Sequence, residues 1–134
     1  MRYQRADTPL KLDDVAAARH FFAGCLAECD PRRERIWVAH LDGQSNCLRL
    51  TSHAGDEHGV DFPLRTIISD AATCGSSAIL LAHNHPSGDP TPSAGDKKAT
   101  RRLACAAEAL DCRVLDHLVF GAGECSSFRE LGLL

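Results

Sequence analysis

The spacing of apolar residues alternates along the chain between the period of a helix and the period of a strand. Apolar side chains at steps of three and four predict a helix over residues 13–29, which Asp30 and the proline after it bring to an end. β-Branched and aromatic residues predict a strand over residues 34–42. Asp42-Gly43 then predicts a hairpin, whose return strand covers residues 46–51.

The same two patterns continue through the rest of the chain. A helix over residues 63–74 is favoured by Pro63 in its first turn and by Gly75 at its C-terminal end. A later helix begins after Ser93 and presents one apolar face, made of Leu103, Ala106, Ala107 and Leu110. The other predicted segments are a loop over 52–59, a strand over 77–82, a proline-rich loop over 83–93, a strand over 113–120, a turn over 121–123 and a terminal cap over 127–134.

Length and composition fit one globular domain. The chain has 134 residues, of which 44% are apolar and 25% charged, the balance of an ordinary globular protein. Because helices and strands mix throughout, we expect an α/β or α+β domain with a mixed sheet. The predicted organisation is a short lead over residues 1–12 followed by the domain over residues 13–134.

Charge and targeting signals narrow the class of protein. The formal net charge of −3 gives no general attraction to nucleic acid or to anionic membranes. No apolar run approaches the ~20 residues of a membrane span, and the first residues lack the apolar core of a signal peptide. An odd number of cysteines favours free thiols in a reducing compartment. We therefore expect a cytoplasmic protein with no membrane partner.

The seven cysteines do not form a recognisable metal-binding pattern. No two of them are spaced as C-x-x-C. Cys25 and Cys29 fall on the apolar stripe of the first predicted helix, and free cysteine is among the most buried residue types. We interpret the cysteines as core residues.

Two histidines follow the predicted strand over residues 77–82 at a spacing that suits a metal ion. In an extended chain, residues i and i+2 point to the same side, so the imidazoles of His83 and His85 can converge on one ion. Taken alone, the pattern fits equally well with a turn that exposes both histidines to solvent.

Asp96 strengthens the metal interpretation. It lies eleven residues after His85, and the proline-rich loop between them can fold it back toward the histidines. Two neutral imidazoles and one carboxylate make a three-ligand site, which leaves a fourth position for water as in catalytic zinc sites. Ser93 and Asp96 are also spaced as a helix N-cap and the third residue of a capping box, and the two interpretations are compatible.

These residues carry a resemblance to a known family. His83-x-His85, then seven residues, Ser93, two residues and Asp96 resemble the JAMM motif of JAB/MPN metalloprotease-like domains. The longer run over residues 83–93, with Thr100 after it, is similar to the RadC family of bacterial JAB domains.

The resemblance to RadC proteins extends beyond the motif. Leu115-Asp116-His117 and residues 127–134 are similar as well, so it covers roughly Asp13 to the C-terminus. It implies a three-layer domain like that of the cytidine deaminases, with a mixed central sheet flanked by helices. It also implies a Zn²⁺ ion, and hydrolysis of a peptide, isopeptide or other amide bond. His117 is open to two interpretations, a residue beside the site or a core residue.

The resemblance assigns roles to individual residues. His83, His85 and Asp96 would hold the zinc ion. Glu34, just before the predicted strand Ile36-Trp37-Val38, would act as the general acid and base, and Ser93 would stabilise the oxyanion. Without the motif, Glu34 would be read as a solvated charge among arginines.

This sequence departs from the family in two respects. RadC relatives commonly have an Arg-Glu pair at the start of the second helix, where this chain has Arg65-Thr66. If the Glu of that pair were the catalytic base of the family, this chain would lack it. We assign the base to Glu34. The N-terminal helical region of full-length relatives, with its helix-hairpin-helix character, is also absent from these 134 residues.

Two alternatives to a hydrolase stay open. RadC proteins are labelled as DNA-repair proteins, so nucleic acid is an alternative partner, although the charge of this chain does not favour it. The domain could also be a metal-binding interaction module without catalytic activity. The sequence identifies neither the substrate nor the oligomeric state.

Overall fold

A mixed five-stranded sheet forms the centre of the molecule. The computed structural model describes residues 10–55 and 62–134. The elements are α1 (Val15–Ala27), β1 (Arg35–Leu41), β2 (Cys47–Ala54), α2 (Leu64–Cys74), β3 (Ala78–Asn84), α3 (Ala94–Glu108), β4 (Arg113–Gly121) and β5 (Glu124–Ser127). The strand order is β2-β1-β3-β4-β5, in which β3 and β4 run parallel and the other neighbours antiparallel.

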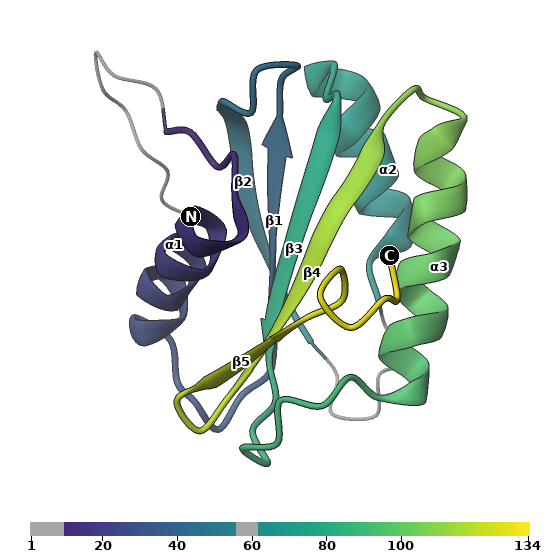
Figure 1. The fold of residues 1–134 in the computed structure, drawn as a ribbon. Coiled ribbons are helices and arrows are strands. Elements are labelled where there is room, and N and C mark those ends of the chain that lie inside the picture. The colour runs from purple at the N-terminus through teal and green to yellow at the C-terminus, as the bar shows by residue number, and fades with distance from the viewer. Residues whose placement is uncertain (1–9, 56–61) are drawn as a thin grey trace.

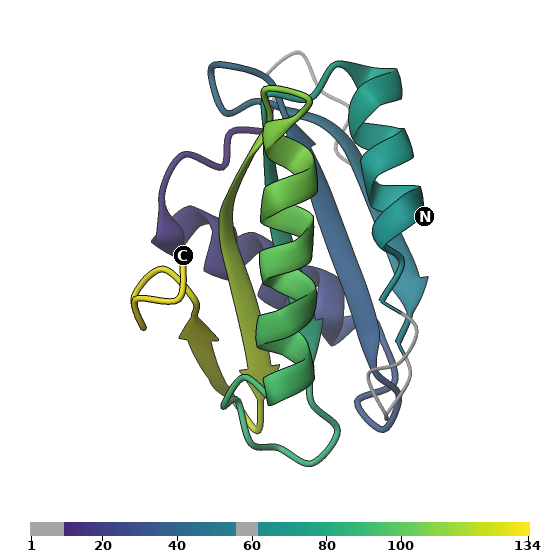
Figure 2. The ribbon, with the colours of Figure 1, turned by 90° about the vertical axis from the view of Figure 1, so that its right-hand side faces the viewer.

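Helices cover both faces of this sheet, so the domain has three layers. Helix α1 lies on one face, and α2 and α3 lie side by side on the other (Figures 1 and 2). Side chains of β1 contribute to the hydrophobic cores on both faces of the sheet, because successive side chains of a strand point to opposite faces. Trp37 and Ala39 pack with Phe22 of α1, whereas Ile36 and Val38 pack on the side of α2 and α3. The mixed α/β fold expected from the sequence is confirmed.

Helix α1 is shorter than the predicted range of 13–29. Asp14 is its N-cap, and its side chain accepts a hydrogen bond from the backbone N–H of Ala17 at 2.7 Å. The capping geometry fixes the start, because the cap residue itself has extended backbone. The hairpin predicted at Asp42 is confirmed, and the Asp42 carboxylate accepts from the backbone N–H groups of Gln44 and Asn46.

The loop predicted over residues 52–59 is wrong over Ser52–Ala54, which continue β2. Pairing with β1 extends as far as Arg35 opposite Ala54, so backbone hydrogen bonds override the polar composition. Residues 56–59 of that prediction lie outside the described residues.

Two expectations for the C-terminal part also need correction. Helix α3 ends at Glu108, so Leu110 lies beyond it and is 39% exposed instead of buried. The segment between the predicted turn and the terminal cap forms β5, which pairs with the end of β4. Its sequence, Glu-Cys-Ser-Ser, holds no β-branched residue that would have indicated a strand. Within the described ranges, no helix combines the length and the apolarity needed to cross a membrane.

We expect the folded protein to lose stability in mild acid because of His40 in β1. The side chain is fully buried, and burial lowers the pKa of His40 below its usual value. Its Nε2 has no hydrogen-bond partner among the described residues. As the pH falls through about 6.5, the unfolded chain takes up a proton that the folded chain resists, so the free energy of unfolding decreases.

The variant His40→Leu tests this prediction. It removes a buried polar atom without a partner, so we expect the free energy of unfolding to rise by roughly 1–3 kcal/mol at neutral pH. Urea titrations at pH 7.5 and 5.5 should show a larger gain at the lower pH. Leucine in place of the exposed His20 is the control, and equal pH dependence in the two variants would contradict the role of His40.

Candidate metal centre

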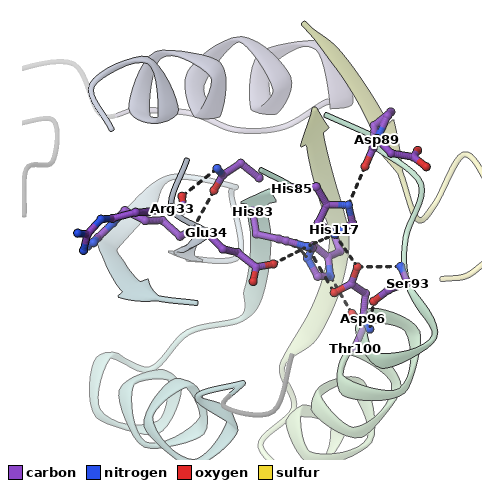
Figure 3. Close-up of polar contacts among 12 residues, drawn as sticks. Arg33, Glu34, His83, His85, Asp89, Ser93, Asp96, Thr100 and His117 are labelled. Carbon is purple, nitrogen blue, oxygen red and sulfur yellow. Dashed lines mark hydrogen bonds and ion pairs between the residues drawn. The ribbon is translucent and has the colours of Figure 1, made fainter. Parts of the chain in front are cut away.

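The two motif histidines lie where β3 ends. His83 is the penultimate residue of β3 and is 2% exposed, and it lies opposite Ile36 in the register of β1. His85 begins the proline-rich loop that leads to α3. The two imidazoles turn toward each other, and their Nε2 atoms are 3.0 Å apart (Figure 3). The convergence expected from their i, i+2 spacing is therefore present.

Two carboxylates face the histidines. Asp96 places Oδ2 3.0 Å from Nε2 of His85 and Oδ1 3.4 Å from Nε2 of His83. Glu34 places Oε1 3.7 Å from Nε2 of His83. Glu34, His83 and His85 together offer three ligand atoms that all lie within 4.8 Å of one another. The structure thus brings together every residue that the sequence proposed for the metal and the base.

The backbone sets the protonation of His85. Its Nδ1 lies 2.7 Å from the carbonyl oxygen of Asp89. A carbonyl can only accept, so Nδ1 carries the hydrogen, and in a neutral ring Nε2 presents a lone pair. That lone pair faces the Asp96 carboxylate, which can only accept, and Nε2 of His83. A hydrogen on Nε2 of His83 or a metal ion between these atoms would satisfy the arrangement.

Asp96 is held by the start of α3. Ser93 is the N-cap of this helix, and its backbone N–H donates to Oδ2 of Asp96 at 2.8 Å, while its Oγ accepts from the backbone N–H of Asp96 at 3.0 Å. The capping box predicted for this pair is confirmed, and it is compatible with a ligand role because Asp96 still faces both histidines. Burial raises the pKa of the Asp96 carboxyl, but hydrogen bonds and charge interaction with His83 and the hydrogen bonds from Ser93 outweigh it and hold this pKa well below its usual value.

Asn84 positions the segment that carries Glu34. Its side-chain oxygen accepts from the backbone N–H of Arg35 at 2.8 Å, and its side-chain nitrogen donates to the carbonyl of Arg33 at 3.0 Å. Both residues flanking Glu34 are therefore tied to the residue between the two motif histidines. Sequence reasoning missed this contact, because it joins positions 49 and 51 residues apart.

Gly55 leaves the space in which the Glu34 side chain lies. A Cβ atom at Gly55 would come within 2.7 Å of Cγ of Glu34 and within 3.1 Å of its Cβ and Cδ. The backbone N–H of Gly55 donates to the carbonyl of Glu34 at 2.9 Å, so the two chains run in close contact. A side chain at this position would displace Glu34.

His117 of β4 contacts the far side of His83. Its Nε2 is 2.7 Å from Nδ1 of His83, and its Nδ1 is 2.7 Å from Oγ1 of Thr100 in α3 (Figure 3). Burial and the neighbouring His83 lower the pKa of His117 well below its usual value, so the ring is neutral. Of the two interpretations of His117, the one beside the site is correct. Thr100 was noted only within the family resemblance, and nothing in its spacing indicated this contact.

The cluster opens onto the surface. A groove of about 680 Å³ is lined by Glu34, His85, Ser93 and Asp96, together with other residues of the loop before α3. A second groove of about 880 Å³ adjoins it at His85 and runs between α1 and the β4–β5 hairpin. The cluster is therefore reachable by a substrate.

Zinc fits the donor set and its spacing. Zinc binds imidazole nitrogen at about 2.0–2.1 Å, which separates two such nitrogens in a tetrahedral site by about 3.3 Å. The 3.0 Å between the two Nε2 atoms requires only a small opening to match. Imidazole nitrogen and carboxylate oxygen are both common zinc ligands. Among the described residues, all the cysteines are free thiols, and none lines the groove that holds the cluster.

The chain is similar to known proteins over most of its length. It is 42% identical over 107 residues to a UPF0758 protein of Pelobacter propionicus, covering 78% of this chain and 46% of the relative. It is 42% identical over 103 residues to UPF0758 protein PM1152 of Pasteurella multocida, covering 76% and 46%. It is also 40% identical over 129 residues to UPF0758 protein YfjY of Escherichia coli, covering 96% and 79%.

The match to a family model extends across all the described helices and strands. The chain spans about half the length of the first two relatives and most of the third. Residues 12–133 match the family model described as the RadC-like JAB domain, a range that contains the His83, His85, Asp96 and Glu34 cluster. The chain therefore belongs to the RadC-like JAB domain family.

Proposed function

We propose that this protein is a zinc-dependent hydrolase that cleaves an amide bond, in a peptide, an isopeptide or another amide. The observation that carries the proposal is the convergence of two imidazole nitrogens and a carboxylate at an open groove. Nε2 of His83, Nε2 of His85 and the Asp96 carboxylate lie within 3.4 Å of one another, close enough to share one metal ion. Such a site beside a second carboxylate suits metal-assisted hydrolysis.

His83, His85 and Asp96 are the proposed zinc ligands. The Asp96 oxygens are at 3.0 and 3.4 Å from the two Nε2 atoms, whereas Glu34 is at 3.7 Å from His83. The lowered pKa of Asp96 keeps it an anion at all physiological pH values. This division leaves Glu34 available to exchange protons.

Glu34 is the proposed general base and acid. Bound zinc would supply a Lewis acid that lowers the pKa of water to about 7 and polarises a carbonyl. Glu34 accepts a proton from the attacking water as its oxygen bonds to the carbonyl carbon. The same carboxyl returns that proton to the amide nitrogen as the C–N bond breaks, which yields a neutral amine and a carboxylic acid. Thr66, at the position of the common family Glu, is exposed on α2 and has no titratable group, so it cannot share this role.

Ser93 is the proposed oxyanion donor. Its Oγ accepts from the backbone of Asp96, which leaves the hydroxyl hydrogen available to donate. Ser93 lies on the same groove as Glu34 and His85, within reach of a carbonyl bound there.

Metal content and substrate profiling test the proposal together. Purified protein is analysed for metal after dialysis against zinc, with about one ion per chain expected. A defined library of synthetic peptides is then incubated with zinc-loaded protein, and new termini are identified by mass spectrometry. Cleavage that disappears on chelation and returns with zinc supports the proposal, and protein that binds no zinc contradicts it.

The two alternative functions predict different outcomes. A silent interaction module would bind zinc and cleave none of the peptides or isopeptide-linked probes. A nucleic-acid role would appear as a salt-dependent shift of DNA at micromolar protein.

The variant Gly55→Ala tests the placement of Glu34. The added methyl group would lie 2.7 Å from Cγ of Glu34, so the carboxylate must move. We expect hydrolysis to fall by about tenfold to a hundredfold, because a small misplacement of a catalytic group is costly. Zinc content should stay unchanged, since the atoms nearest to the new methyl group belong to Glu34 and not to the proposed ligands. Gly24→Ala, where nothing lies within 4 Å of the new methyl, is the control. An unaltered rate in the Gly55 variant would argue against Glu34 as the base.

A further inference from the structure

The two histidines of the cluster are oriented by different means. Nδ1 of His85 meets a backbone carbonyl, which can only accept, so its tautomer has no alternative. Nδ1 of His83 meets another imidazole, Nε2 of His117, which can either accept or donate. The protonation of His83 is therefore decided by the groups beyond it.

A chain of hydrogen bonds runs from His83 into α3. His83 Nδ1 to His117 Nε2 and His117 Nδ1 to Thr100 Oγ1 are both 2.7 Å. All three side chains are buried, with exposed fractions of 1–2%. The ring of His117 is held in place by stacking on Phe128, at 4.6 Å between ring centres and 16° between planes. The chain is thus rigid and screened from water.

Two polarities of this chain are compatible with neutral rings. In one, His83 donates from Nδ1 to His117, and His117 donates from Nδ1 to the Thr100 oxygen. In the other, Thr100 donates to His117, His117 donates from Nε2 to His83, and His83 carries its hydrogen on Nε2. Only the first leaves the lone pair of His83 Nε2 directed at His85 and Asp96.

We propose that His117 and Thr100 are positioning residues that select the metal-binding tautomer of His83, with the Thr100 hydroxyl as the terminal acceptor. This inference rests on the proposed zinc site and deepens it. Zinc binding then requires that the hydrogen bonds of the buried chain run from His83 through His117 to Thr100. Residues that do not themselves bind the ion then control its affinity, as partners behind ligating histidines generally do.

Nitrogen-15 NMR of the histidine rings tests the direction of the chain. In labelled protein, zinc should leave both His83 and His117 with hydrogen on Nδ1 and none on Nε2. A zinc-loaded spectrum with hydrogen on Nε2 of His117 would overturn the inference, even if zinc binding itself were intact.

Matched variants test the energetic part. Thr100→Val keeps the shape of the side chain but removes the acceptor, and it should weaken zinc binding by about tenfold to a hundredfold in competition with a chromophoric chelator. Thr100→Ser keeps the hydroxyl and should restore the affinity. His117→Leu and His117→Gln form a second pair, in which only the glutamine oxygen can accept from His83.

The outcomes separate this inference from the proposed function. Wild-type protein that binds no zinc contradicts the proposed function. Wild-type protein that binds zinc, with the valine and serine variants of Thr100 binding equally well, contradicts only the role of the chain. Thermal unfolding of the metal-free variants shows whether folding has changed, and comparable midpoints with different zinc affinities support the positioning role.

Discussion

Protein that carries both His83→Gln and His85→Gln is expected to bind essentially no zinc while remaining folded. The double change removes both nitrogen ligands, and the remaining carboxylates of Asp96 and Glu34 have little preference for zinc. Glutamine is close to histidine in size, so the buried space at His83 stays filled. The two hydrophobic cores contain neither residue.

Metal analysis and thermal unfolding measure this effect. Wild-type protein should fall from about one zinc per chain to near zero in the variant. Zinc at a hundred times its dissociation constant should stabilise the wild type by about 2.7 kcal/mol and the variant not at all. The matched control replaces His20 and His53, neither of which belongs to the cluster, with glutamine. Retention of zinc by the double variant would place the ion elsewhere in the molecule.

The geometry within each pair of candidate site residues could be predicted because it is local. His83 and His85 share a side of an extended segment, and Ser93 and Asp96 form a capping box within one helical turn. Only the fold can bring these two pairs together. The sequence indicated that the proline-rich loop could fold Asp96 back toward the histidines, and the family resemblance supported that interpretation. The assignment of Glu34 as the base rested on the resemblance alone, because the residues next to Glu34 in the sequence are arginines.

The residues that support the site could not be found in the same way. Asn84 acts through the backbone of Arg33 and Arg35, and Thr100 acts through a histidine on a neighbouring strand. Contacts of this kind depend on strand register. The alternation of apolar residues indicates which face of the sheet a residue lies on, but not which residue lies opposite it on the next strand.

The boundaries of the sheet show the same difference between local and long-range information. Strands with apolar and β-branched residues were predicted from their composition. Ser52–Ala54 and β5 are polar, and they become strands because β1 and β4 offer free backbone groups along their edges. The β5 hairpin matters for the site, because residues of β4, the turn and β5 line the groove that adjoins His85.

Glu34→Gln is expected to abolish hydrolysis without displacing the zinc. Glutamine keeps the length and shape of the side chain but cannot take a proton from water. A general base contributes about 10²–10⁴ in rate, which corresponds to roughly 3–5 kcal/mol of transition-state stabilisation. The loss should appear in kcat, with KM little changed, because the substrate carbonyl is bound by other groups.

The comparison that decides the role of Glu34 uses zinc content and rate in the same samples. Glu108→Gln, at the exposed end of α3, changes the net charge equally and should leave both quantities as in the wild type. If Glu34 were instead a third zinc ligand, as its position within 4.8 Å of both histidines allows, the glutamine variant would lose metal and activity together. Full zinc occupancy with a rate reduced at least a hundredfold would assign proton transfer to Glu34 and ligation to Asp96, whereas full occupancy with an unchanged rate would exclude Glu34 from the chemistry.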